Sequence, residues 1–207
     1  MLARFLTNLA AGVLLALTFP SVAAAEWHFV PTIGWTFQAD TSFLDLEQAT
    51  SKVHWTFGGT VTLVGSGILG VEGMFVWTPG FFTNDEIALP DRIVTKSHAL
   101  AMMGNAVLTT PRNWTEYGLR PFLSGGFGVL GFSRTEVNNV FPDKRNMPAF
   151  NIGGGAIGFL SKRTGVRFDL RYYNSIHKGD EGCPVASIPP GCHVRYMTAS
   201  VGVVIRR

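Results

Sequence analysis

Three neighbouring residues of the types that perform nucleophilic catalysis lie in the last part of the chain. Ser175, His177 and Asp180 combine a hydroxyl, a base and a carboxylate, which are the components of hydrolytic triads. This spacing also occurs in ordinary loops, and the sequence shows no neighbouring group that would stabilise an oxyanion. We therefore rank a lipid-modifying enzyme third among three functional hypotheses, behind the two that are given at the end of this subsection.

Ion pairing is the second kind of chemistry that the sequence offers. Charged residues lie on the polar side of several stretches in which every second residue is apolar. The candidates for one cluster in the interior are Glu72, Arg120, Arg167, Asp169 and Arg171, with Lys52 and His54 on the same predicted face. Because an unpaired buried ion costs several kcal/mol, we expect the two carboxylates to pair with the arginines. A polar plug is the first interpretation, and a narrow ion path is the alternative.

Both cysteines of the chain, Cys183 and Cys192, lie in one segment rich in glycine and proline. An exported protein reaches an oxidising compartment, where a disulfide is permitted. We expect the two thiols to pair and to make their loop rigid, at a gain of at most a few kcal/mol. Two unpaired thiols are the alternative.

Metal and cofactor sites are not indicated. The histidines have no metal-ligand spacing, and the two cysteines are better explained by a disulfide. The histidines are His28, His54, His98, His177 and His193. The glycines lie within predicted strands and not before a helix, as a phosphate-binding loop would require. We predict no cofactor and no metal.

The N-terminus predicts export. Arg4 provides a positive charge, residues 9–19 are apolar, and Ala23 and Ala25 frame a small-residue cleavage pattern before Glu26. The apolar run is too short to span a bilayer as a helix. We therefore predict a signal peptide at residues 1–25 and one mature domain at residues 26–207.

Charge and hydropathy exclude two classes of protein. The 17 basic and 14 acidic residues give a net charge of +3, and removing Arg4 leaves +2, which argues against nucleic acid as a partner. No later stretch offers ~20 consecutive apolar residues, so a helical membrane protein is excluded for the mature chain. Only 15% of the residues are charged, whereas 12% are aromatic and 24 are glycine. This composition suits a fold that exposes apolar surface to something other than water.

Strict alternation of apolar and polar residues is the main structural signal. The clearest run places Val53, Trp55 and Phe57 opposite His54 and Thr56, as in a strand with one apolar face. Seven further runs have apolar faces that begin at Trp27, Leu69, Leu100, Tyr117, Phe150, Val166 and Met197. Most runs are ~9–12 residues long, close to what a tilted membrane-spanning strand needs. The sequence thus predicts eight strands.

The connections between these runs alternate in length. The short ones are residues 65–67, 110–116 and 161–165, and the long ones are residues 39–51, 79–92, 134–147 and 174–193. Short periplasmic turns and long extracellular loops are typical of outer-membrane barrels. With an even number of strands, both termini lie on the periplasmic side.

The composition of the two faces indicates which one is exposed to lipid. The polar face is rich in glycine, which cannot fill an apolar cavity: Gly126, Gly128, Gly153, Gly155 and Gly202. Aromatic residues near strand ends suit interfacial belts: Trp27, Trp35, Trp55, Trp77, Tyr117, Phe132 and Tyr172. The sequence therefore predicts an all-β, eight-stranded, antiparallel up-and-down transmembrane β-barrel with apolar side chains outside.

Three segments carry a family resemblance: residues 120–129, 150–155 and 165–173. They resemble OmpA-like small outer-membrane β-barrel domains, and the layout of the whole mature chain is similar to theirs. The resemblance implies a Gram-negative outer membrane, a monomer, and as partners the barrel assembly machinery, outer-membrane lipids and lipopolysaccharide. The chain departs from the family at its last residue, Arg207, where such barrels usually carry an aromatic residue.

These observations favour a non-enzymatic outer-membrane protein with a structural or surface-interaction role. Rigid scaffolds commonly act through variable loops, and the long loop at residues 174–193, with its two cysteines, is the first candidate contact surface. A narrow pore is the second hypothesis.

Overall fold

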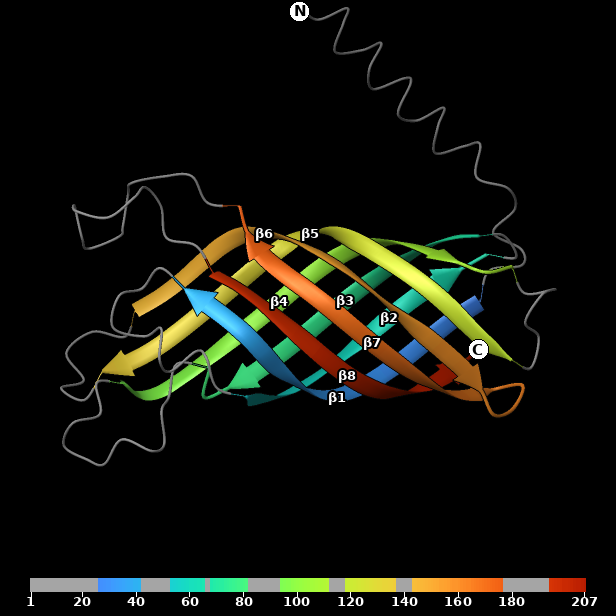
Figure 1. Cartoon of the computed structure of the whole chain (residues 1–207), viewed down its shortest axis with the longest axis horizontal. Coiled ribbons are helices and arrows are strands. Elements are labelled where there is room, and N and C mark those ends of the chain that lie inside the picture. Colours follow the sequence, from blue (N-terminus) through green and yellow to red (C-terminus); the bar gives the residue numbers. More distant parts are fainter. Residues whose placement is uncertain are drawn as a thin grey trace, which may run out of the picture.

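The chain forms a closed barrel of eight antiparallel strands (Figure 1). The computed structural model describes residues 26–41, 53–65, 68–81, 94–111, 118–136, 143–176 and 194–207. The strands are β1 (Glu26–Thr41), β2 (His54–Val64), β3 (Leu69–Pro79), β4 (Val94–Thr109), β5 (Leu119–Glu136), β6 (Asp143–Phe159), β7 (Thr164–Ser175) and β8 (Val194–Arg206). The predicted fold class is confirmed.

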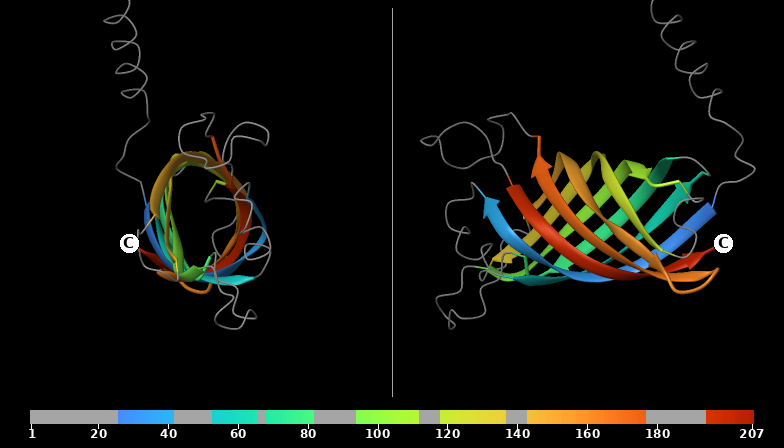
Figure 2. Two further views of the ribbon diagram at one scale, coloured as in Figure 1. Left: turned by 90° about the vertical axis from the view of Figure 1, so that its left-hand side faces the viewer. Right: turned by 45° about the vertical axis from the view of Figure 1, so that its right-hand side comes forward.

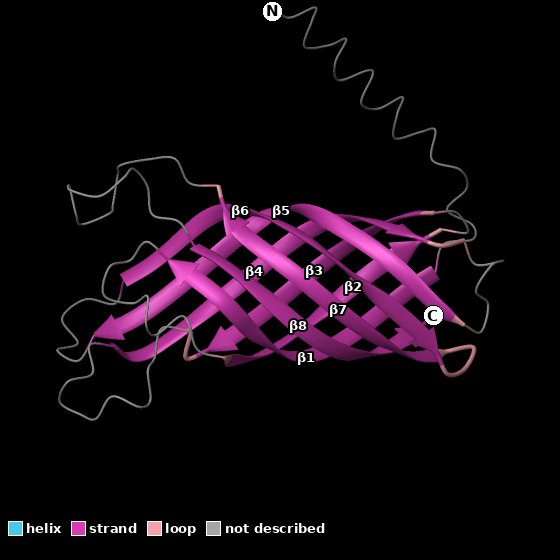
Figure 3. Ribbon diagram, in the orientation of Figure 1, coloured by secondary structure: helices cyan, strands magenta, loops and turns pink. Residues whose placement is uncertain are grey.

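Each strand pairs with its neighbour in the chain, and pairing of β1 with β8 closes the ring. Trp27 and Arg207 complete this seam, because each backbone amide donates to the carbonyl of the other. The end-on view in Figure 2 shows the ring, and Figure 3 shows that strands make up nearly all of the described part. No helix within the described residues is long and apolar enough to cross a membrane.

Five of the eight strands are longer than the ~9–12 residues that the sequence predicts for most of them: β1, β4, β5, β6 and β8. β5 has 18 residues and β6 has 17, against 11 in β2 and β3. Part of the predicted long loop at residues 134–147 is therefore strand, since β6 begins at Asp143. β1 likewise continues to Thr41, and β7 begins at Thr164, inside the predicted turn.

Large apolar side chains cover the outside of the barrel, as the alternation predicts. Trp55 is 61% exposed and Phe127 is 71% exposed. On the side of the long loops, Trp35 packs edge-on against Trp55 at 6.3 Å between ring centroids. On the side of the short turns, Trp27 stacks on Phe29 at the same centroid distance. Aromatic residues thus lie at both ends of the apolar surface, where the two membrane interfaces are expected.

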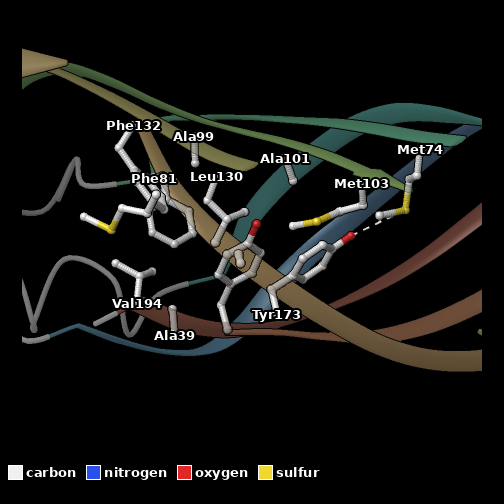
Figure 4. Packing of buried hydrophobic residues seen from close by; sticks show 13 residues of the cluster. Ala39, Met74, Phe81, Ala99, Ala101, Met103, Leu130, Phe132, Tyr173 and Val194 are labelled. Carbon is white, nitrogen blue, oxygen red and sulfur yellow. Dashed lines mark hydrogen bonds between the residues drawn. The ribbon is translucent and has the colours of Figure 1, made fainter. Parts of the chain in front are cut away.

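The lumen is filled in three layers. The layer on the side of the long loops is apolar and is called here the aromatic layer, because it packs around Phe81, Phe132 and Tyr173, which Figure 4 labels, and Tyr196. A middle layer holds the charged side chains described below. The layer on the side of the short turns is an apolar cluster: Val30, Val107, Phe122, Ile157, Phe159 and Val204. A barrel of eight strands is just narrow enough for side chains to fill it completely.

Two residues lie on the face opposite to their predicted one. Phe132, which we expected in an interfacial belt, is 7% exposed and packs in the lumen against Phe81 at 5.8 Å between ring centroids. Its even position in β5 places it on the same side as Arg120. Gln38 stands at an even position of β1, as His28 does, and the alternation of the strand therefore predicts it inside; it is exposed because the pairing of β1 with β8 shifts between Phe37 and Asp40. Gln38 adopts a positive φ of 50° at this irregularity.

Candidate functional site

The middle layer of the lumen, called here the ionic layer, consists of Glu72, Arg167, Asp169 and Arg171. Glu72 extends from β3 and its side chain is fully buried. One carboxylate oxygen lies 2.6 Å from Arg167 Nη1, and the other lies 3.1 Å from Arg171 Nη2. Thr62 and the amide of Asn105 each donate a further hydrogen bond to this carboxylate, at 3.2 and 3.0 Å. Its hydrogen-bonding capacity is therefore fully used.

Asp169 bridges the same two arginines from within β7. Its Oδ2 atom lies 2.6 Å from Arg167 Nη2 and 2.9 Å from Arg171 Nη2, and its Oδ1 atom accepts from Arg171 Nε at 3.2 Å. The three residues alternate along one strand and so point the same way. Two carboxylates and two guanidinium groups make the layer electrically neutral. Neutrality combined with several hydrogen bonds to each charged group is what allows such ions to be buried.

Neighbouring strands complete the layer with polar groups. Arg171 Nη1 donates to the Asn151 carbonyl oxygen at 2.9 Å, and the Asn151 amide donates to Asn105 at 2.7 Å. The guanidinium group of Arg167 lies over the ring of Phe122, 4.1 Å from its centroid. This arrangement combines ion pairing with a cation–π contact. The side chains involved come from β2 to β7, so the layer ties opposite walls of the barrel together.

Inward glycines provide the space for these long side chains. A Cβ atom at Gly153 would lie 2.9 Å from Cγ of Arg171 and 2.7 Å from the Leu170 carbonyl oxygen. A Cβ atom at Gly155 would collide with the backbone carbonyl of Phe168 and lie 3.0 Å from Cζ of Phe122. Real side chains do not approach this closely, so glycine is required beside the ionic layer.

Arg120, the fifth residue of the predicted cluster, is not joined to the other four by any ion pair found among the described residues. It is buried near the short turns, where its Nε donates to the backbone carbonyl of Thr110 at 2.8 Å. The structure thus brings four of the five predicted charges together. His54 lies near the other end, 6.1 Å from the Phe81 ring centroid, and Lys52 lies outside the described residues.

The aromatic layer closes the lumen beyond the ionic layer. Tyr173 and Tyr196 are almost completely buried and stack at 4.7 Å between ring centroids. Phe81 contacts Tyr196 edge-on at 5.2 Å. The Tyr173 hydroxyl donates to the sulfur of Met74 at 3.6 Å (Figure 4). Sequence reasoning placed Phe81 in a loop, and Gly80, with a φ of 71°, turns the chain inward just before it.

A small cavity lies beside the ionic layer, next to Asp169, Arg171 and Tyr173. Its volume is about 20 Å³, enough for roughly one water molecule. Threonines from β1, β2 and β8 form its other walls. A space of this size in a filled lumen does not make a continuous passage.

Ser175, the serine of the alternative enzyme hypothesis, has a structural partner. Ser175 is buried at the end of β7, where its hydroxyl oxygen accepts a hydrogen bond from the Val194 amide at 2.9 Å. His177, Asp180, Cys183 and Cys192 lie outside the described residues, as does the predicted signal peptide. Within the described part, no group of three or more histidine, cysteine, aspartate or glutamate side chains is placed to hold a metal ion.

Solved structures with the same arrangement of strands are outer-membrane proteins. The crystal structure of Neisserial surface protein A superposes with a TM-score of 0.55 at 11% identity, over 88% of this chain and 98% of that one. The fold is that of the small outer-membrane barrels. This outer-membrane-barrel fold also matches OprG from Pseudomonas aeruginosa, with a TM-score of 0.55 at 10% identity over 89% of this chain and 96% of that one.

A third match to the outer-membrane-barrel fold is Ail, the attachment invasion locus protein of Yersinia pestis, in complex with the heparin analogue sucrose octasulfate. Its TM-score is 0.53 at 14% identity, over 89% of this chain and 99% of that one. No family model and no curated protein matches the sequence. These likenesses therefore establish the fold, and the OmpA-like resemblance of the sequence is shown at that level.

Proposed function

We propose that the chain is an exported, non-enzymatic outer-membrane protein whose closed barrel holds its long loops at the cell surface for contact with other molecules. In this proposal residues 1–25 are a signal peptide that is removed. The barrel is embedded as a monomer among outer-membrane lipids and lipopolysaccharide after insertion by the barrel assembly machinery.

The filled lumen is the observation that carries the proposal. A pore needs a continuous polar path, whereas here an aromatic layer and an apolar cluster lie on either side of a neutral ionic layer. Arg171, Tyr173 and Tyr196 are each at most 1% exposed. This packing favours a sealed barrel over the narrow pore.

The buried position of Ser175 favours a binding role over catalysis. Its hydroxyl oxygen already accepts the Val194 amide and lies at the edge of the barrel wall. A hydrolytic serine needs a free hydroxyl beside a general base. The long loops then remain as the elements through which the protein would act.

The location and the sealed lumen can be tested together. The full-length chain is expressed in a Gram-negative host, recovered from the outer membrane in detergent, and run on gels before and after boiling. A compact band that shifts on boiling supports the closed membrane barrel. In planar bilayers we expect no single-channel steps. A stable monomer that dissolves without detergent, or reproducible conductance, would overturn the proposal.

The role of the loops needs a separate variant. Replacing residues 177–193 with a short glycine–serine turn leaves every described strand intact. We expect the heat-modifiable band to persist while binding of cells to an immobilised sulfated glycan is lost, a probe suggested by the sucrose octasulfate bound to Ail. Unchanged binding after replacement of each long loop in turn would contradict a loop-based role.

The proposed disulfide between Cys183 and Cys192 is tested on the same preparation. After unfolding without reductant, a thiol reagent should label neither cysteine, and after reduction it should label both. Labelling before reduction would show that the thiols are unpaired.

A further inference from the structure

Two hollows interrupt the apolar outer surface of β1 to β4. The first, of about 620 Å³, lies over Pro31 and Gly59 between the rings of Phe29, Phe75 and Trp77. The second, of about 550 Å³, lies over Gly73 and Gly104 next to Trp27. Both hollows border Val61, so together they form one furrow on the membrane-facing surface. Both hollows are shallow and open along the surface, unlike enclosed ligand pockets.

The glycines of this furrow are not required by the backbone. A Cβ atom at Gly73 would meet nothing within 4 Å, and one at Gly104 would lie 3.9 Å from its nearest neighbour. These two glycines pair directly across β3 and β4. The inward glycines differ, because a side chain there would collide with the backbone of the neighbouring strand or with the ionic layer. Larger side chains would fit at Gly73 and Gly104, so close packing of the strands does not require glycine there. The absence of side chains at these two residues gives the furrow its depth.

The furrow has the dimensions of a lipid chain. From Phe57 to Leu63 it follows β2 for six residue steps, or about 20 Å of strand. Because the strands tilt by about 40°, this length of strand corresponds to roughly 15 Å across the membrane. That distance is half of the ~30 Å hydrocarbon core, which is the depth of one leaflet.

We infer that the furrow retains one acyl chain of a membrane phospholipid. This inference rests on the proposed membrane location. The furrow is continuous with the apolar, lipid-facing surface, and its walls consist of aromatic and aliphatic side chains. A second barrel is a poorer occupant, because a large exposed ring projects beside the furrow floor and would hold another barrel wall away from it. Here Phe127, 71% exposed and paired with Gly104, stands above the furrow floor.

The test compares bound lipid in three forms of the full-length, detergent-purified barrel. Dimyristoylphosphatidylcholine is added to the detergent, and lipid adducts are counted by native mass spectrometry. The furrow variant carries Gly73→Leu and Gly104→Leu, and the matched control carries Ala156→Leu on the outward face of β6. We expect one retained lipid in the parent and in the control. The furrow variant should retain about 10-fold less, the factor expected when roughly two methylene groups lose their contacts.

Three outcomes would overturn the inference. Equal lipid adducts in all three proteins would show that the furrow holds no particular lipid. Loss of a dimer peak in the furrow variant alone would identify a second copy as the occupant. Lipid lost equally in the control would indicate a general surface effect. Heat-modifiable migration of each variant is checked first, so a folded membrane barrel without retained lipid contradicts this inference while leaving the proposed function intact.

Discussion

The two faces of β7 show how differently one strand meets its two surroundings. Arg167, Asp169 and Arg171 point into the lumen and form five hydrogen bonds or ion contacts with one another and with Glu72. The residues between them, Phe168 and Leu170, point to the outside and are about half exposed. The inner face is held by specific partners, whereas the outer face has only to be apolar.

This difference has a physical cause. Lipid is a fluid solvent that adapts to any apolar side chain, so many residues serve equally well outside. The lumen is closed, and each polar group there must find its partner on another strand, because no bulk solvent replaces a missing one. Neighbouring residues on β7 should therefore respond very differently to comparable substitutions.

The largest difference is expected between Arg171 and its neighbour Leu170. Arg171→Met leaves two carboxylates facing one guanidinium group and should lower the free energy of unfolding by about 3–5 kcal/mol. Leu170→Met, on the lipid side, should cost less than about 1.5 kcal/mol. Urea unfolding in lipid vesicles, followed by loss of the heat-modifiable band, measures both. Similar losses in the two variants would mean that the ionic layer is not the main support of the lumen.

The next difference is expected between Tyr173 and Tyr172. Tyr173→Ala removes a fully buried ring that stacks on Tyr196. It should lower the free energy of unfolding by about 3 kcal/mol, as the loss of other buried aromatic rings does. Tyr172 packs on the outside against Phe150 at 6.4 Å between ring centroids, where lipid can fill the space that the alanine leaves. We expect a loss of about 1 kcal/mol for Tyr172→Ala, near the value of an aromatic pair. The same unfolding assay applies, and a larger loss for Tyr172→Ala would reverse the assignment of faces.

Glycines on the two faces should respond with opposite sign. Gly155→Ala makes a methyl group collide with the backbone carbonyl of Phe168 and places it 3.0 Å from Phe122 in the lumen, which should lower the free energy of unfolding by about 1–3 kcal/mol through overpacking. The new Cβ atom of Gly73→Ala would meet nothing within 4 Å. This variant should raise the free energy of unfolding by about 0.4–1 kcal/mol, because alanine restricts the unfolded chain. Thermal unfolding midpoints in detergent suffice here. A stabilising Gly155→Ala would show that the lumen has unused space.

The smallest effect is a coupling within the ionic layer. Adding Glu72→Gln to Arg171→Met removes the excess carboxylate. The loss in the free energy of unfolding of the double variant should therefore be about 1 kcal/mol smaller than the sum of the losses of the two single variants. A double-mutant cycle in the same unfolding assay measures this term. Additive losses would show that Glu72 and Arg171 act independently despite their 3.1 Å separation.

The fold could be predicted because alternation is a local property. Each of the eight strands carries its apolar face in its own sequence, and the choice of an apolar outside followed from the glycines opposite. The exceptions are local as well. At Gln38 an irregular pairing reverses the alternation. Phe132 was assigned by its place near a strand end, although its even position already put it on the inward side with Arg120.

The pattern of pairing within the site could not be predicted. The sequence indicated that buried acids would meet arginines, but not that Arg120 would instead bond a backbone carbonyl. Which residues meet across a lumen depends on the stagger of the strands around the barrel, and the sequence of one strand does not contain this information. Phe81 carries no signal in the sequence, because nothing marks a residue near the start of a long connection as part of the interior.

Unequal strand lengths give the barrel an uneven mouth. β7 pairs with β6 only from Ala149 onward, so residues 143–148 of β6 pair in the ladder with β5 alone. Six residues correspond to roughly 20 Å of strand. This part of β6 therefore extends past the end of the described part of β7, and in the ladder only β5 supports it. The described strands thus end at different heights around the ring, and the connections that follow them begin at different distances from the middle of the barrel.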